Sequence, residues 1–168
     1  MVDFDPRMHE YYPLLTAAHG IVKVRVRQSM DGKALMMTEL LKLPDGQPVL
    51  RVAPMPADVN AAGDIFGGWV MAHGDIAGGI VATQRARGRV ATVAVNSFQF
   101  KQPVSVGDVV SIYAQVIEVG RTSITVDVSV YAERNPVNPV VVKVTEAKLT
   151  FVALDREGAK RLVPAAVP

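Results

Sequence analysis

The sequence contains no cysteine. This excludes a disulfide framework, a thiolate metal site and a thiol nucleophile. It also has no run of lysine and arginine that would predict a nucleic-acid-binding tail, because 18 basic and 16 acidic residues leave a net charge of only +2. No stretch approaches the length of apolar sequence that a membrane-spanning helix needs, so we expect no membrane insertion. The start Met-Val-Asp-Phe-Asp lacks the basic and apolar regions of a signal peptide, and we therefore expect a cytoplasmic protein.

With 168 residues, of which 49% are hydrophobic, the chain can bury one good core. We predict an N-terminal extension at residues 1–47 and a single domain at residues 48–164. Within the extension, residues 21–27 alternate with period two and predict a strand. Its three basic residues favour a solvated sheet edge, with an anion site as the alternative. Residues 34–42 fit either a short helix or a strand, and residues 48–53 predict another strand.

A long apolar helix is predicted at residues 68–87, with Gly88 as its C-terminal cap. Its glycines at 74, 78 and 79 each cost about 0.5–1 kcal/mol relative to alanine. Such a helix makes sense where a sheet, a partner helix or a ligand approaches it closely.

After residue 88 the chain changes to the period-two alternation of strands. A tight hairpin is indicated at residues 119–122. The apolar positions change parity near residues 96–97 and again near 143–144, which predicts β-bulges there. We expect an α+β fold in which a curved antiparallel sheet wraps around the helix. The four predicted strands are residues 90–101, 108–119, 122–131 and 140–154.

The predicted helix carries a single carboxylate, Asp75, among apolar and very small neighbours. A carboxylate there is costly unless it stays hydrated, is hydrogen-bonded or shifts its pKa. Gly68, at the predicted helix start, lies seven residues earlier, so the two share one face about 10 Å apart. The first N–H groups of a helix are unpaired and lie at the positive end of its dipole. Together they make a site that polarises a carbonyl and delivers a base; the alternative is that Asp75 only caps or pairs with another group.

Residues 55–71, Met-Pro-Ala-Asp-Val-Asn-Ala-Ala-Gly-Asp-Ile-Phe-Gly-Gly-Trp-Val-Met, resemble the signature of hotdog-fold acyl-CoA thioesterases. The resemblance is closest to the small bacterial acyl-CoA hydrolases of the cytosolic long-chain acyl-CoA hydrolase group. Residues 88–90, 103–110 and 119–123 fit the same family in the same order. The match covers roughly residues 50–164, and the N-terminal segment lies outside it.

The resemblance implies a hotdog fold whose protomers form a homodimer, and often a hexamer built as a trimer of dimers, with the active site at the dimer interface. It implies that Asp75 is the catalytic acid residue and that the Gly68 N–H polarises the thioester oxygen. Asn60 would act with Asp75 of the neighbouring protomer. The substrate would be an acyl-CoA, and no cofactor or metal is implied beyond the coenzyme A that the substrate carries. The residues implied to contact coenzyme A are Lys101, Pro103, Arg121, Thr122 and Ser123.

Two residues depart from the family pattern. Gly74 stands where relatives more often carry a larger side chain such as methionine, which would widen the pocket. Asn96 stands where many relatives have glutamate, which would alter the surroundings of the site or the choice of substrate.

Thioester hydrolysis by this set would use the Gly68 N–H for the oxyanion, and Asp75 either as general base on water or as a nucleophile that forms an anhydride. Asp64 is the competing carboxylate and is better suited to a turn. His73 projects about 200° away from Asp75 on a helix, which disfavours a dyad, and His9 and His19 fit surface positions.

The large aromatic residues of this part of the chain fit packing first and an acyl-tunnel lining second; they are Trp69, Phe98 and Phe100. Two other functions stay open on the same fold, an acyl-thioester hydratase or dehydratase and a non-catalytic acyl-CoA sensor. A hydratase would require a suitably placed aspartate–histidine pair, and a sensor would normally require an attached output module. The set of Asn60, Gly68 and Asp75 favours hydrolysis.

Overall fold

The computed structural model describes residues 14–17, 20–28, 34–39, 41–135 and 137–165. Three strands precede the main domain: β1 (Leu14–Ala17), β2 (Gly20–Gln28) and β3 (Ala34–Glu39). They form an antiparallel sheet in the order β1-β2-β3. The predicted strand at residues 21–27 is confirmed, but the interpretation of it as a sheet edge is wrong. Residues 34–39 form a strand, and this strand supplies β2 with a second neighbour.

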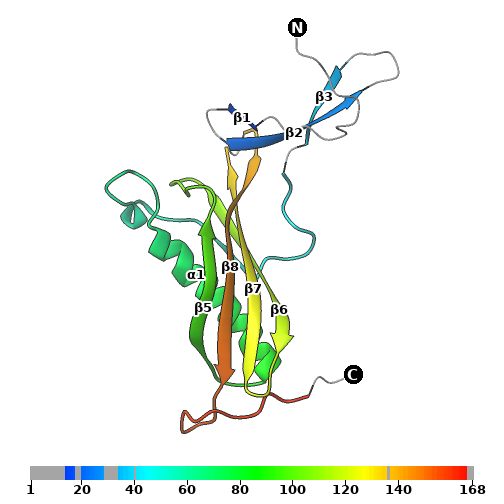
Figure 1. The fold of residues 1–168 in the computed structure, drawn as a ribbon. Helices are drawn as coiled ribbons and strands as arrows, with labels where there is room; N and C mark the ends of the chain where they lie inside the picture. Colours follow the sequence, from blue (N-terminus) through cyan, green and yellow to red (C-terminus); the bar gives the residue numbers. More distant parts are fainter. Residues whose placement is uncertain (1–13, 18–19, 29–33, 40, 136, 166–168) are drawn as a thin grey trace.

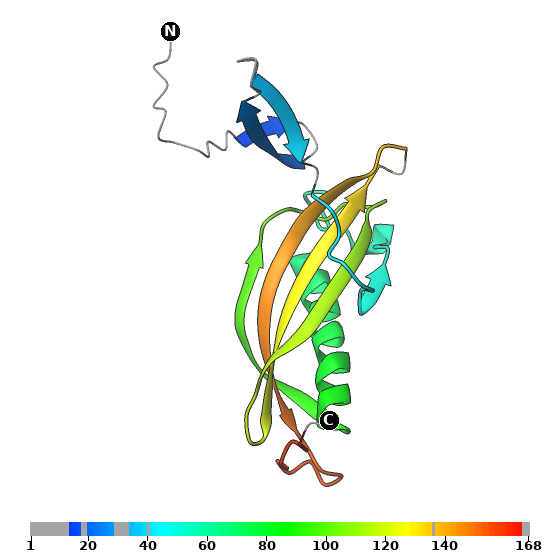
Figure 2. The same ribbon diagram turned by 90° about the vertical axis from the view of Figure 1, so that its right-hand side faces the viewer.

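The main domain is one helix on one antiparallel sheet (Figure 1). The helix, α1 (Gly67–Ala86), runs along one face of the sheet, and the strands curve around it (Figure 2). This confirms the predicted α+β arrangement, whereas the division of the chain at residues 47 and 48 stays a prediction. The sheet order is β4-β6-β7-β8-β5. The strands are β4 (Leu50–Val52), β5 (Val90–Phe100), β6 (Val109–Val119), β7 (Ser123–Arg134) and β8 (Val140–Ala153), and a short 3₁₀ turn, η1 (Pro56–Asp58), lies before the helix.

The core lies between α1 and the inner face of the sheet. Ile124, Val126, Val128 and Val130 alternate along β7 and are completely buried. The helix meets them with small residues, and a Cβ on Gly78 would lie only 3.0 Å from the ring of Phe151. The close approach predicted from the helix glycines is therefore confirmed, because any side chain here would push the helix away from the sheet.

Both predicted bulges are present. The pairing of β5 with β8 shifts between Thr92 and Ala94 and again between Val95 and Ser97. The pairing of β7 with β8 shifts opposite Val144, which has no partner in the register. The shift in β8 lets side chains of opposite parity, such as Val142 and Leu149, reach the same core.

The ends of α1 differ by one residue from the prediction. The helix begins at Gly67 rather than Gly68, and it ends at Ala86. The left-handed residue after it is Arg87, at φ 51°, and not Gly88. The N–H groups of Arg87 and Gly88 bond the carbonyls of Gln84 and Thr83 in the pattern of a Schellman motif. In the part of the chain that the structure describes, no helix is both long and apolar enough to cross a membrane.

Candidate active site

The loop before α1 holds Asn60 in a fixed position. The side-chain oxygen of Asn60 accepts hydrogen bonds from the N–H groups of Ala62, at 2.8 Å, and Asp64, at 3.2 Å. The backbone N–H of Asn60 bonds the Asp64 carbonyl at 2.7 Å. The turn role predicted for Asp64 is thus seen in its backbone, and the Asn60 side chain is oriented by the loop that it closes.

The first N–H groups of α1 are open. Within residues 41–135 and 137–165, the N–H groups of Gly67 and Gly68 have no hydrogen-bond acceptor, and the residue before the helix, Phe66, supplies no side-chain cap. A Cβ on Gly68 would meet nothing within 4 Å. Two donors without an acceptor among the described residues, at the positive end of a helix dipole, suit a developing negative charge.

A pocket of about 370 Å³ opens beside this helix start. It brings Asn60, Lys101 and Pro103 together with Gly67, the residue next to Gly68. The lining also includes the polar residues Asp64 and Gln102. Its apolar lining residues are Ile65, Val70, Phe100, Val104 and Val144. A concave site of this size, mostly apolar with a few polar groups, is typical of small-molecule binding.

Asp75 lies two turns further along α1 and is held by a residue of β5. The hydroxyl of Thr92 donates a hydrogen bond to Oδ1 of Asp75 at 2.6 Å. The carboxylate is half-buried. Asp75 therefore has a hydrogen-bond partner, as the interpretation of a merely paired carboxylate expects. This one bond does not use the full capacity of the group, since a carboxylate accepts several hydrogen bonds.

Within one protomer Asp75 and Asn60 do not meet. Asp75 is not among the residues that line the pocket with Asn60. The helical rise between Gly68 and Asp75 is about 10 Å. The reacting thioester group of a substrate is much shorter than this rise. An Asp75 that acts on a thioester held at the helix start would therefore have to come from elsewhere, such as a second copy of the chain.

The residues implied for coenzyme A divide between two ends of the sheet. Lys101 and Pro103 lie in the pocket, just after β5. Arg121, Thr122 and Ser123 lie at the hairpin between β6 and β7, where Arg121 and Thr122 carbonyls bond the N–H groups of Val163 and Ala153. The strands between the two ends span roughly 35 Å. One protomer therefore does not bring the five residues together.

The segment that carries Lys101 and Pro103 is tied down by a buried ion pair. Asp108, which is only 4% exposed, accepts hydrogen bonds from Arg134 Nε at 3.1 Å and from the Ser105 N–H at 3.0 Å. Arg134 also donates to the Pro103 carbonyl. Because both charges are paired and hydrogen-bonded, the loop gains a rigid anchor.

Lys101 itself contacts Glu146, which also pairs with Lys143. Hydrogen bonds from Lys101 and then Lys143 lower the pKa of Glu146 to about 2. Burial alone would lower the pKa of Lys143, but its hydrogen bond to Glu146 raises it above the usual value. The three residues form a charged cluster beside the mouth of the pocket, with an excess of one positive charge.

The remaining candidates do not join the site. His73 Nδ1 lies 2.8 Å from the Trp69 carbonyl, and its ring stacks on Trp69 with centroids 3.9 Å apart; the predicted absence of a His73–Asp75 dyad is confirmed. The Asn96 side chain accepts a hydrogen bond from Thr150 at 2.8 Å and not from the Asp75 region. His9 and His19 lie outside the described residues. Among the residues described, no group of three or more His, Asp and Glu side chains could hold a metal ion.

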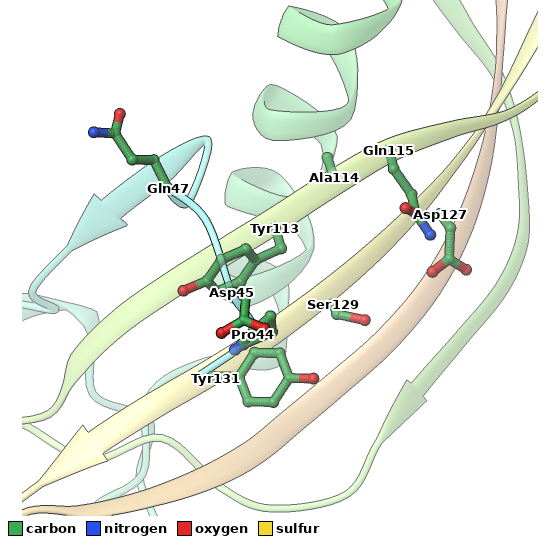
Figure 3. A pocket seen from close by; sticks show the side chains of 9 residues that line it. All are labelled: Pro44, Asp45, Gln47, Tyr113, Ala114, Gln115, Asp127, Ser129 and Tyr131. Carbon is green, nitrogen blue, oxygen red and sulfur yellow. The ribbon is translucent and has the colours of Figure 1, made fainter. Parts of the chain in front are cut away.

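A second hollow, of about 350 Å³, lies on the face of the sheet opposite α1 (Figure 3). Tyr113 and Tyr131 form its floor, with ring centroids 5.8 Å apart. Asp45 and Asp127 face it from the segment before β4 and from β7. Its described lining does not include Asn60, Gly68 or Asp75, so it is separate from the candidate active site.

Thr92 is the residue of the site that sequence reasoning missed. It lies 17 positions after Asp75 in the neighbouring strand. An isolated threonine in a valine-rich strand carries no signal of its own. Only the register of β5 against the helix reveals the contact.

Comparison with known proteins identifies similar chains. The model of the thioesterase superfamily matches residues 62–138. The acyl-CoA thioester hydrolase YciA of Escherichia coli (strain K12) is 45% identical over 130 residues, which are 76% of this chain and 98% of that protein. A hexameric thioesterase from Yersinia pestis is 46% identical, with a TM-score of 0.69 over 73% of this chain and all of that one. A hexameric hotdog fold thioesterase of Campylobacter jejuni is 40% identical, with a TM-score of 0.68 over 71% of this chain and 91% of that one.

Proposed function

The chain belongs to the hotdog-fold acyl-CoA thioester hydrolases, and from this premise we propose that it hydrolyses acyl-CoA thioesters through Gly68, Asp75 and Asn60. The observation that carries the proposal is the pair of open N–H groups at the start of α1, beside a pocket that contains Asn60. The Thr92 hydroxyl, which holds the carboxylate of Asp75, supports it further.

In the proposed reaction the Gly68 N–H binds the thioester oxygen and stabilises the oxyanion as it develops. One such donor is typically worth about 3–4 kcal/mol. In one route Asp75 takes a proton from water, and the resulting hydroxide attacks the carbonyl carbon. In the other route the Asp75 carboxylate attacks that carbon itself, and water hydrolyses the anhydride that forms. In both routes the carbon–sulfur bond breaks and coenzyme A leaves as a thiolate, so no strong general acid is required.

Asn60 orients the water or the carboxylate by hydrogen bonding through its side-chain amide. The amide oxygen is already used by the loop, which leaves the NH₂ group as the donor available to the site. Coenzyme A would lie along the strand ends, with Lys101 and Pro103 from one protomer and Arg121, Thr122 and Ser123 from another.

The active enzyme is a homodimer, assembled further into a hexamer as a trimer of dimers. Large apolar side chains on the outer face of α1 and on β5 are exposed, with Ile76 at 50% and Val93 at 54%. In addition, β5 is an edge strand of 11 residues with one side unpaired by the described strands. A second copy that covers this face would bury the exposed apolar side chains and cover the open edge of β5. It would also bring the partner's Asp75 towards Asn60.

The experiment that tests the function is release of free thiol from acyl-CoA substrates of C2 to C18 chain length. The wild type and the Asp75→Ala variant are measured in parallel. We expect turnover by the wild type and its loss in the variant, with coenzyme A binding retained. Binding of acyl-CoA without turnover by the wild type would instead favour a sensor, and full activity of the variant would contradict the role of Asp75.

A further inference from the structure

Two phenylalanine rings of β5 rest on two glycines of α1. A Cβ on Gly67 would lie 3.2 Å from the ring of Phe100, and a Cβ on Gly74 would lie 3.6 Å from the ring of Phe98. The two rings contact each other, with centroids 5.0 Å apart and planes tilted by 48°. The rings therefore form one aromatic pair that spans two turns of the helix.

The aromatic pair lies beside both reactive positions. Gly67 immediately precedes Gly68, and Gly74 immediately precedes Asp75. Gly67 and Gly74 are seven residues apart, and so are Gly68 and Asp75. Each of these spacings runs along the helix axis for about 10 Å, and the two lie on faces of the helix that differ by about 100°. The rings thus flank the proposed oxyanion donor at one end and Asp75 of the same protomer at the other.

Phe100 does not have the burial of a core residue. It is 53% exposed, and it lines the pocket together with Val70, Val104 and Val144. Phe98 is half-buried. By contrast, the Phe151 ring, which lies against the next helix glycine, Gly78, is only 1% exposed. An aromatic surface left open in a pocket is available to an apolar ligand.

We propose that the Phe98–Phe100 pair is the wall that limits the length of the acyl chain, and that Gly67 and Gly74 set the position of this wall. The inference rests on the proposed hydrolysis of acyl-CoA at the same site. A glycine at each contact lets the rings sit against the helix backbone. A Cβ at position 74 would only touch the Phe98 ring, at 3.6 Å, whereas a longer side chain there would press against it.

The test is the ratio of kcat/KM for a long acyl-CoA, C14, to that for a short one, C4. Phe100→Ala and Phe98→Leu widen the site, and we expect the ratio to rise about tenfold or more, as is typical when a pocket gains room for methylene groups. Gly74→Met narrows the site, and we expect the ratio to fall. A ratio is used because it is unaffected by any loss of active protein.

Phe151→Leu is the matched control. The Phe151 ring also lies against a helix glycine, 3.0 Å from where a Cβ on Gly78 would be, but it is fully enclosed in the core. We expect it to lower Tm without changing the ratio. The proposal is overturned if Phe100→Ala and Phe98→Leu remain active with the wild-type ratio. It is equally overturned if KM changes by the same factor at every chain length, because the rings would then contact the coenzyme A part. Either result leaves the proposed hydrolysis intact, whereas absence of turnover by the wild type overturns both.

Discussion

Asp75 and Thr92 are bound to each other across the gap between α1 and β5. The bond of 2.6 Å joins a hydroxyl donor to a carboxylate acceptor. Hydrogen bonds to charged groups are worth about 1.5–3 kcal/mol. Thr92 therefore positions the carboxylate and takes no direct part in the proposed hydrolysis.

Thr92→Val removes the hydroxyl and keeps the shape of the side chain. We expect kcat to fall by about tenfold to hundredfold, in line with the loss of one charge-assisted hydrogen bond. Thr92→Ser keeps the donor and is expected to retain most of the activity. Equal losses in the two variants would mean that packing, and not the hydroxyl, is what the site needs.

Glu146 makes stability depend on pH in the acid range. Lys101 and Lys143 lower its pKa from the ordinary 4.5 to about 2, so the folded state favours the ionised form. This contribution is fully present above pH 4.5 and is lost as the pH falls from 4.5 towards 2.

Glu146→Gln is expected to abolish that dependence. The Tm of the wild type exceeds that of the variant above pH 4.5, and the difference shrinks as the pH falls towards 2. Thermal unfolding of both proteins across this window measures it. A difference that stays constant throughout would show that Glu146 contributes by something other than its charge.

At the residue scale the sequence proposes site residues where chemistry and pattern coincide. Asp75 stands out because carboxylates are rare in apolar helices, and Asn60 and Gly68 because of the motif in which they lie. Thr92 and the Phe98–Gly74 contact were not predictable. Both depend on the register of β5, which contains two bulges, and each bulge changes which side chains face the helix.

The start of α1 is the element on which the proposed catalysis depends most. Its first two N–H groups are open because no side chain caps them. Proline is tolerated in the first turn of a helix, where its missing N–H breaks no helical bond. A proline at position 68 can therefore remove the donor N–H without breaking a helical hydrogen bond.

Gly68→Pro removes the proposed oxyanion donor, whereas Gly68→Ala keeps it and meets no neighbour within 4 Å. We expect Gly68→Pro to lower kcat by about a hundredfold or more and Gly68→Ala to stay close to the wild type in both kcat and Tm. Circular dichroism of both variants controls for loss of the helix. Retained turnover in a folded Gly68→Pro variant would place the donor elsewhere.

The helix and the long strands of the main domain were predictable to within a few residues, whereas β1 was not predicted, and the errors have local causes. The parity changes correctly predicted bulges near residues 96 and 144. Propensity favours Gly88 as the C-terminal cap, but the left-handed residue of the Schellman motif is one residue earlier, at Arg87. The edge assignment of β2 was wrong because residues 34–39 have no decisive period, so its second neighbour was not visible in the sequence.

At the scale of the whole molecule, one protomer holds only part of the site that the sequence implies. Asn60 lies in the pocket at the helix start, whereas Asp75 lies two turns away against β5. The exposed apolar face of α1 and the open edge of β5 adjoin Asp75. Sequence alone could imply a shared site only through family resemblance, because no pattern within one chain records which surface meets another copy.

The measurement that tests the shared site most directly is complementation between two inactive variants. Asn60→Ala and Asp75→Ala are each expected to show little turnover of acyl-CoA alone. In a mixed dimer, one site lacks both groups and the other has both, so activity should return when the variants are co-expressed and purified through different tags. Recovery of thiol release in the mixed dimer is the result that the account predicts; its absence, in mixed dimers that are folded and bind coenzyme A, would contradict a site built from two protomers.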